Sequence, residues 1–261
     1  MRLSAARRYW RAVVFLGVFI GEATPPVEID LDQLLFYGKF CESSGALVNQ
    51  ASAIGSSDEI SGNGTNTDVA YSETGIIDDA YLYNGTSAST AIDTLSTSTT
   101  AVGSLNIWAN FPAFNDSTLW SFGDASADSN IYLELTPASS KILGTCKNAS
   151  SGGIQWRFLS DAISNLTDTW HMITLVQNGT APKIFIDSVE GTTFSTETDK
   201  TAWVPDITGL DNFRVCSRQD DGDANARFCN ALTDEMSYWG RSLSQDEINT
   251  LFNSGSCHAL P

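Results

Sequence analysis

The chain has 261 residues, of which only 17% are charged, and its acids outnumber its bases by 31 to 14, which gives a net charge of −17. This length accommodates one large β-sandwich or two small domains with a real core. The acidic balance argues against nucleic-acid binding through phosphates, and it is typical of a solvated surface outside the cytoplasm or of a surface that binds cations.

Residues 1–32 form an N-terminal segment with two interpretations. Arginines precede the apolar run Ala12–Ile20 and small residues follow it, which fits a secretory signal peptide. Tyr9–Phe15 is also β-prone, so Val27–Tyr37 could pair with it as a second strand of a retained docking arm. The apolar run is too short to cross a bilayer as a helix, so no transmembrane span is predicted.

An all-β domain is predicted over residues 33–256. Short apolar or alternating runs recur there between turn signals such as Asp124, Asn178-Gly179 and Asp221-Gly222, and the Gly- and Ser-rich stretch 43–68 reads as a long loop. The pattern is typical of a two-sheet sandwich. The predicted strands are Leu34–Phe40, Leu105–Phe111, Leu119–Phe122, Ile131–Leu135, Ile142–Cys146, Ile154–Phe158, Trp170–Val176, Lys183–Ile186, Asn212–Cys216 and Phe228–Trp239.

One helix is predicted near the end of the chain, before a tail of residues 257–261. Ser244 begins the sequence Ser-Gln-Asp-Glu, in which the side chains of Ser244 and Glu247 can bond each other's backbone N–H groups as a capping box. Apolar residues then recur on one helical face, and Gly255 is expected to supply the left-handed residue that ends the helix.

Four segments in the right order resemble a laminin-G-like domain of the concanavalin A-like lectin/glucanase superfamily. They are Phe36–Gly45, Ala80–Thr86, Trp170–Asp187 and Asp234–Gly255, the last of which carries the family's acidic pair, aromatic residue and arginine ahead of the helix. The resemblance implies a jelly-roll sandwich of two antiparallel sheets with one short helix. It also implies glycan binding as the default function.

Five cysteines are present, and none has the spacing of a zinc site. Cys216 and Cys229 flank an acidic loop between two predicted strands, and the resemblance brings Cys41 and Cys257 to neighbouring ends of the domain. Two disulfides are therefore predicted, Cys216–Cys229 and Cys41–Cys257, with Cys146 left over. The alternative is five reduced thiols that pack as small hydrophobic groups.

A calcium site is predicted in the acidic loop. Asp221, Asp223 and Asn225 alternate there, a spacing by which a short loop turns several oxygens toward one hard cation. The EF-hand pattern fails because Leu232 stands where its bidentate carboxylate belongs. The resemblance adds Asp234 as a second candidate ligand, and the alternative is a merely solvated hairpin tip.

An enzyme is not predicted, although the superfamily includes glucanases with alternating acids on one strand. Glu28, Asp30 and Asp32 superficially match that pattern, but they precede the first recognisable strand of the sandwich. A Ser-His-Asp site is not indicated either, because His171 begins an ordinary family strand and His258 lies in the tail.

The function predicted is a non-catalytic, lectin-like module for a glycan or glycoprotein surface. Sugars stack on exposed aromatic rings, and Trp156 and Trp203 lie nearest to loop ends, although both could instead belong to the core. The alternative is a structural or assembly component of a virion or surface filament that contacts neighbouring subunits. Either function places the protein outside the cell or on a virion surface.

Overall fold

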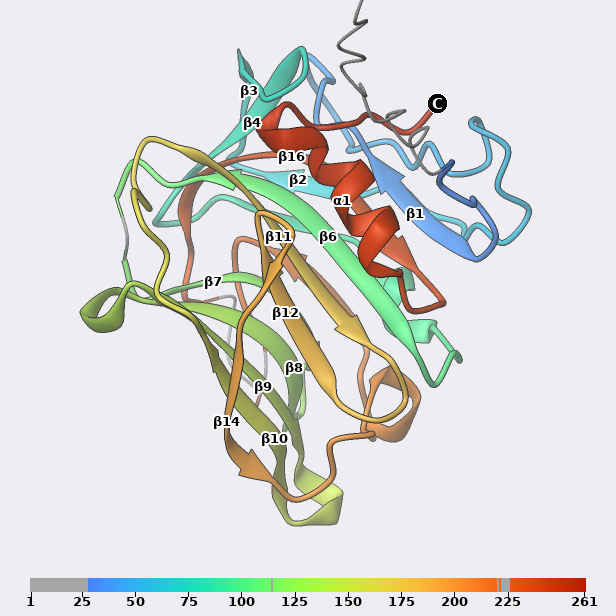
Figure 1. Ribbon diagram of the computed structural model, residues 1–261, viewed down its shortest axis with the longest axis vertical. Helices are drawn as coiled ribbons and strands as arrows, with labels where there is room; N and C mark the ends of the chain where they lie inside the picture. Colours follow the sequence, from blue (N-terminus) through green and yellow to red (C-terminus); the bar gives the residue numbers. More distant parts are fainter. Residues whose placement is uncertain (1–27, 114, 220, 222–225) are drawn as a thin grey trace, which may run out of the picture.

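A computed structural model describes residues 28–113, 115–219, 221 and 226–261. Two antiparallel sheets stack face to face with a single short helix on the outside of one of them (Figure 1). The predicted jelly-roll sandwich is therefore confirmed.

The first sheet runs in the order β13-β12-β11-β6-β16-β4-β3, and β1 pairs with the end of β16. Its centre is the long strand β16, which pairs with β4 through its first half and with β6 along most of its length. The strands of this sheet are β1 (Leu34–Gly38), β3 (Ala70–Thr74), β4 (Asp79–Asn84), β6 (Gly103–Asn110), β11 (Trp170–Gln177), β12 (Pro182–Ile186), β13 (Val189–Glu190) and β16 (Asn230–Trp239).

The second sheet runs in the order β14-β10-β9-β8-β7-β15-β5-β2. Its middle strands follow one another as hairpins, which is why the sequence shows apolar runs at short, even spacing there. The strands are β2 (Thr65–Thr67), β5 (Ser89–Ala91), β7 (Ser117–Asp124), β8 (Ala127–Thr136), β9 (Lys141–Asn148), β10 (Gly153–Ser160), β14 (Thr192–Glu197) and β15 (Asn212–Val215).

Apolar side chains form two layers of core. The larger lies between the sheets and contains residues such as Trp120, Phe122 and Tyr238, which alternate inward along their strands. The smaller lies between the outer face of the first sheet and the helix, where Trp108 stacks on Phe252 with ring centroids 5.8 Å apart. The helix therefore covers apolar surface that the sandwich would otherwise expose.

The helix α1 (Gln245–Phe252) begins as predicted. The Ser244 hydroxyl accepts a hydrogen bond from the Glu247 N–H at 3.3 Å, and the Glu247 carboxylate accepts one from the Ser244 N–H at 2.9 Å. The predicted end is wrong, because Asn253 supplies the left-handed residue that caps the helix and Gly255 lies beyond it. Asparagine tolerates that conformation because its short amide bonds locally.

Several strands escape prediction because they lack an apolar pattern. β2, β3, β5 and β14 are short and rich in Ser and Thr, and β2, β3 and β14 lie at sheet edges. Edge strands gain little from burial, so an alternating apolar pattern contributes little to their stability.

One of the two predicted disulfides is present. Cys216 and Cys229 are bonded and join the end of β15 to the segment before β16. The predicted Cys41–Cys257 bridge is wrong, because both cysteines are free thiols: Cys41 is exposed, and Cys257 is buried in the small core under α1. Cys146 is also free and lies in the larger core between the sheets. The two ends of the domain do adjoin, since β1 pairs with β16, but the two thiols lie in different environments.

The predictions for the N-terminal segment fall mostly on residues 1–27, which lie outside the described residues. Within the described part of the chain, no helix is long and apolar enough to cross a membrane.

Candidate functional site

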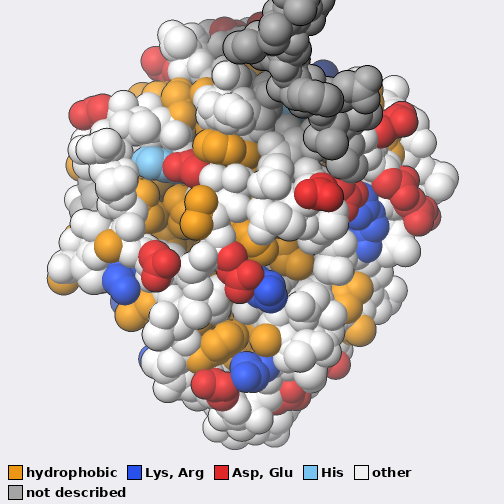
Figure 2. All heavy atoms as spheres, in the orientation of Figure 1, with side chains coloured by type: hydrophobic (Ala, Val, Ile, Leu, Met, Phe, Trp, Pro, Cys, Tyr) orange, Lys and Arg blue, Asp and Glu red, His pale blue; other side chains and the backbone are white. Residues whose placement is uncertain are grey.

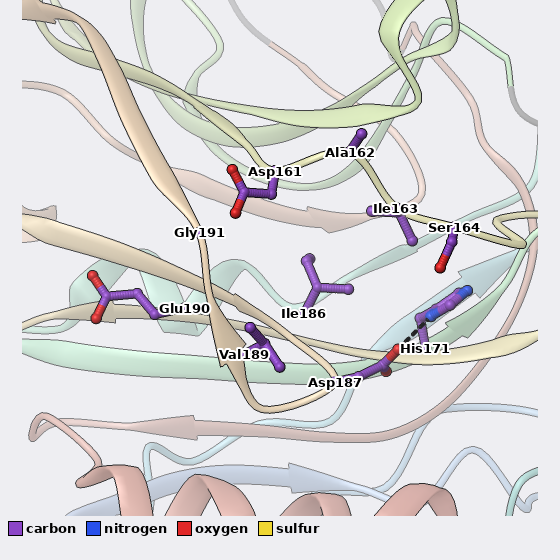
Figure 3. Close-up of a pocket in the computed structure, with 10 residues that line it drawn as sticks. All are labelled: Asp161, Ala162, Ile163, Ser164, His171, Ile186, Asp187, Val189, Glu190 and Gly191. Carbon is purple, nitrogen blue, oxygen red and sulfur yellow. Dashed lines mark hydrogen bonds and ion pairs between the residues drawn. The ribbon is translucent and has the colours of Figure 1, made fainter.

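A pocket of about 210 Å³ opens where the chain passes from one sheet to the other. At this edge the hairpin β11–β12 ends, β13 pairs with β12, and Gly191 leads directly into β14 of the second sheet. The segment after β10 forms the opposite wall. We call this site the His171 pocket, and it is lined by Asp161, Ala162, Ile163, Ser164, His171, Ile186, Asp187, Val189, Glu190 and Gly191 (Figure 3).

The His171 imidazole is fixed by hydrogen bonds at both nitrogens. Its Nδ1 lies 2.7 Å from Asp187 Oδ2, and its Nε2 lies 3.3 Å from the Asn165 carbonyl oxygen. The second oxygen of Asp187 accepts the Met172 N–H at 2.9 Å. Burial alone lowers the pKa of His171, but the hydrogen bond and charge of Asp187 outweigh it and raise the pKa above its ordinary value.

The walls of the pocket combine apolar side chains with polar groups that have no hydrogen-bond partner among the described residues. Ile163, Ile186 and Val189 supply the apolar surface, and Val189 is the one large hydrophobic side chain exposed in the described part of the chain. Figure 2 accordingly shows hydrophobic side chains interspersed with acidic ones rather than gathered into one broad patch. The Asp161 carboxylate and the Ser164 hydroxyl make no hydrogen bond with a described residue.

The pocket places Ser164, His171 and Asp187 together, yet it does not form a nucleophilic triad. In such a triad the imidazole Nε2 accepts the serine proton. Here Nε2 faces the Asn165 carbonyl, an acceptor, so it must carry a proton to make that contact. Figure 3 shows the ring bonded to Asp187 and not to Ser164. The arrangement orders the pocket wall, and the imidazole makes no hydrogen bond with Ser164.

The two tryptophans predicted as exposed sugar-stacking rings are both wholly buried, so that prediction is wrong. Trp156 stacks on Phe158, and its indole N–H donates to the Ala202 carbonyl at 2.9 Å. A bulge in β10 between Ile154 and Trp156 turns the Trp156 ring inward, beside Cys146 of the next strand. Trp203 packs between the sheets against Phe122.

Asp221 and Asp234, the two predicted calcium ligands within the described residues, are not brought together. Asp223 and Asn225 lie outside the described residues, while Asp221 is exposed, and its N–H bonds the carbonyls of Asp124 and Ala127 at the turn of the second sheet. Asp234 lies in the first sheet and is fully buried. Among the described residues no cluster of three or more His, Cys, Asp or Glu side chains could hold a metal. Calcium in the acidic loop stays a prediction.

Asp234 has a structural task instead. Its Oδ2 accepts the N–H groups of Ile76 and Ile77 at 3.0 and 3.1 Å, which closes the turn between β3 and β4. Burial raises the pKa of Asp234 to about 8, although these hydrogen bonds oppose the shift. Burial likewise raises the pKa of Glu235 to about 7, against the effect of the hydrogen bond from the Tyr37 hydroxyl.

Glu28, Asp30 and Asp32 belong to no strand, so they do not present a row of acids on one face of a sheet. Asp30 accepts the Asp32 N–H at 2.9 Å within a turn ahead of β1. Arg241 bonds the Asp30 and Asp32 carbonyl oxygens and so ties this turn to the end of β16.

One part of the pocket, the pairing of His171 with Asp187, has a signal in the sequence, although it was not predicted. The Asn178-Gly179 turn forms the hairpin in which Ile173 pairs with Ile186, and this register alone brings His171 beside Asp187. The other wall, Asp161–Ser164, comes from an irregular segment whose position no pattern in the sequence specifies.

Comparison with solved structures shows the same sandwich in several proteins. The receptor-binding domain of botulinum neurotoxin type G superimposes with a TM-score of 0.59 at 12% identity, over 85% of this chain and 51% of that one. The NanB sialidase of Streptococcus pneumoniae gives 0.55 at 14% identity, over 66% of this chain and 27% of that one. The chain thus spans about half of the neurotoxin domain and less of the sialidase, and at these identities the likeness shows the fold alone.

A third solved structure matches over almost its whole length. Domain 4 of AbnA, a GH43 extracellular arabinanase of Geobacillus stearothermophilus solved with arabinotriose, has a TM-score of 0.58 at 17% identity, over 83% of this chain and 97% of that one. No curated protein sequence matches the chain. A laminin G family model matches residues 84–249, which is more than half of the chain. The chain therefore belongs to the concanavalin A-like lectin/glucanases superfamily.

Proposed function

We propose that the protein is a non-catalytic, lectin-like module that binds a neutral glycan at the His171 pocket. The observation that carries the proposal is the pairing of an apolar wall with free acceptors, because a sugar ring presents C–H faces to the first and hydroxyl groups to the second. The volume of about 210 Å³ is below the roughly 300–1,000 Å³ of pockets for drug-sized ligands, so it suits a single sugar ring.

The charges of the pocket favour a ligand without a negative charge. Asp161, Asp187 and Glu190 face it, and its one basic ring, His171, is already bonded to Asp187. Lys183 does not line the pocket, and its Nζ forms an ion pair with Glu190 Oε2 at 2.9 Å. A sugar carboxylate would meet acids here and lose its hydration without a cation to replace it.

Two further facts support the proposal. The fold recurs in a domain solved with arabinotriose and in a receptor-binding domain. The disulfide is consistent with an extracellular environment, where a glycan or glycoprotein surface would be met. The partner proposed is such a surface.

The test is a glycan array followed by calorimetry with the best neutral ligand. Asp161→Ala removes a free charged acceptor and should weaken binding roughly tenfold to a hundredfold, the range for hydrogen bonds to charged groups. Glu73→Gln, which removes another exposed negative charge, from β3, is the control and should bind normally. The assignment would be overturned if no neutral glycan bound, or if Asp161→Ala and Glu73→Gln bound the ligand with equal affinity. Release of reducing sugar from the ligand would overturn its non-catalytic character.

A further inference from the structure

The outward face of the second sheet carries a group of cations that the acidic composition does not lead one to expect. Arg157 of β10, Thr145 of β9 and Tyr132 of β8 lie directly opposite one another across three strands. Their chain neighbours Trp156, Cys146 and Ile131 point into the core, so this row faces away from it.

A second pocket, of about 330 Å³, lies on this row, and we call it the Arg157 pocket. It is lined by three cations, Lys147, Arg157 and Arg218, together with Tyr132 and Ile154. Two acids also line it: Asp128, which forms an ion pair with Lys147, and the exposed Asp221. The cations that line the pocket thus outnumber its acids by three to two, in a chain whose net charge is −17.

Arg157 differs from the other arginines of the described chain in its partners. Arg214, Arg218, Arg227 and Arg241 each form an ion pair with a carboxylate. Arg157 forms none within the described residues, and its one side-chain hydrogen bond runs from Nε to Thr145 Oγ1 at 3.2 Å. The bond from Nε holds the side chain in place and leaves the two terminal nitrogens as donors.

Two more groups complete the site. The Tyr132 hydroxyl makes no hydrogen bond with a described residue, while Arg218 lies over the Tyr132 ring with its guanidinium carbon 4.5 Å from the ring centroid. Arg218 is itself held by Glu134 at 3.4 Å. Ordered side chains of this kind bind a ligand with little further loss of entropy.

We propose that the Arg157 pocket binds a sugar that carries one oxyanion, a carboxylate or a sulfate. The two terminal nitrogens of Arg157 would bind the oxyanion as a fork, and the Tyr132 hydroxyl and Lys147 would donate beside it. Ile154 supplies an apolar contact for the ring. A long polyanion is disfavoured because the parts of it outside the pocket would be repelled by the protein's net charge of −17. A sugar with a single charge bound inside the pocket is screened from most of that repulsion.

This site is independent of the His171 pocket. The His171 pocket lies at the β13 edge of the first sheet, and its acids disfavour a negatively charged ligand. The Arg157 pocket lies on the outward face of the second sheet, and its proposed ligand carries a negative charge. Substitutions in one pocket should leave the ligand of the other unaffected.

The experiment compares three oligosaccharides by calorimetry: one with a single uronic acid, its methyl ester, and a monosulfated analogue of the same length. The acid should bind, and the neutral ester should bind at least tenfold more weakly because the charge-assisted hydrogen bonds are lost. Binding of the sulfated analogue alone would assign sulfate as the oxyanion. Equal binding of acid and ester, or no binding of either charged sugar, would overturn the proposal.

Arg157→Gln should weaken binding of the charged sugar roughly tenfold or more. The control is Lys141→Gln, which removes the same charge from the same face of β9, about 13 Å from Thr145 along the strand. Tyr132→Phe removes only a hydroxyl, and it tests the site separately if Arg157→Gln unfolds. An equal loss in Arg157→Gln and Lys141→Gln would mean general electrostatic attraction and no site. Asp161→Ala should leave this ligand's affinity unchanged, so failure here is distinguishable from failure of the neutral-glycan function.

Discussion

His171 is bonded at both ring nitrogens to acceptors, the Asp187 carboxylate and the Asn165 carbonyl, and only the protonated ring can donate to both. We therefore expect its pKa to lie above the ordinary value of about 6.5. NMR titration of the ring protons in a His258→Gln background leaves a single histidine to observe. Asp187→Asn should lower the midpoint by removing the charge. A wild-type midpoint at or below that of a model peptide would contradict the assignment.

The part of the His171 pocket that comes from one hairpin is predictable from the sequence, whereas the part that comes from residues far apart in the chain is not. The register of β11 and β12 brings His171 to Asp187 and is readable from the Asn178-Gly179 turn. Trp156 shows the opposite case, because a bulge of one residue decides which way its ring points and nothing in the local pattern marks the bulge.

Among the secondary-structure elements, the helix α1 has a capping box whose contribution to stability can be measured. Ser244→Ala removes the acceptor for the Glu247 N–H and should lower the free energy of unfolding by about 1 kcal/mol. Asn249→Ala, at an exposed position in the middle of the helix, is the control and should cost nothing, because alanine is the best helix former. Chemical denaturation with both variants decides the point: equal stability would mean that the cap does not hold the helix.

Elements with an apolar face were predictable, and elements without one were not. Strands such as β6, β11 and β16 carry apolar residues that lie against a core, so burial and sequence pattern agree. The strand β14 alternates between half-buried and exposed residues and has only one apolar side chain, Phe194, so its pairing with β10 is what makes it a strand. Such long-range pairing leaves no trace in a short window of sequence.

For the molecule as a whole, three buried acids predict an unusual dependence of stability on pH. Burial raises the pKa of Glu134 and Glu235 to about 7 and that of Asp234 to about 8. The folded state then holds these protons more tightly than the unfolded state, so their contribution is complete near pH 4 and is lost as the pH rises through 7 and 8. His171, whose pKa is also raised, acts in the same direction.

We therefore expect the free energy of unfolding to fall by a few kcal/mol between pH 5 and pH 8, measured by urea denaturation at constant ionic strength. Asp234→Asn mimics the protonated acid and should reduce this slope, while Asp246→Asn, at an exposed position on α1, should not. Stability that is flat or rises over this interval would show that these carboxylates are ionised at little cost. Asp199 and Glu247, whose pKa values are lowered, act only below about pH 4.

The passage of the chain from β13 to β14 limits which residues the His171 pocket can carry. A β-carbon on Gly191 would lie 2.7 Å from Asp161 Oδ2, which is closer than atoms can approach without moving. The space between Gly191 and the Asp161 carboxylate therefore accommodates the hydrogen atom of a glycine and no larger side chain. One added methyl group at this crossing would displace the Asp161 carboxylate and weaken the glycan binding proposed for this pocket, while every buried ring of the sandwich stayed where it is.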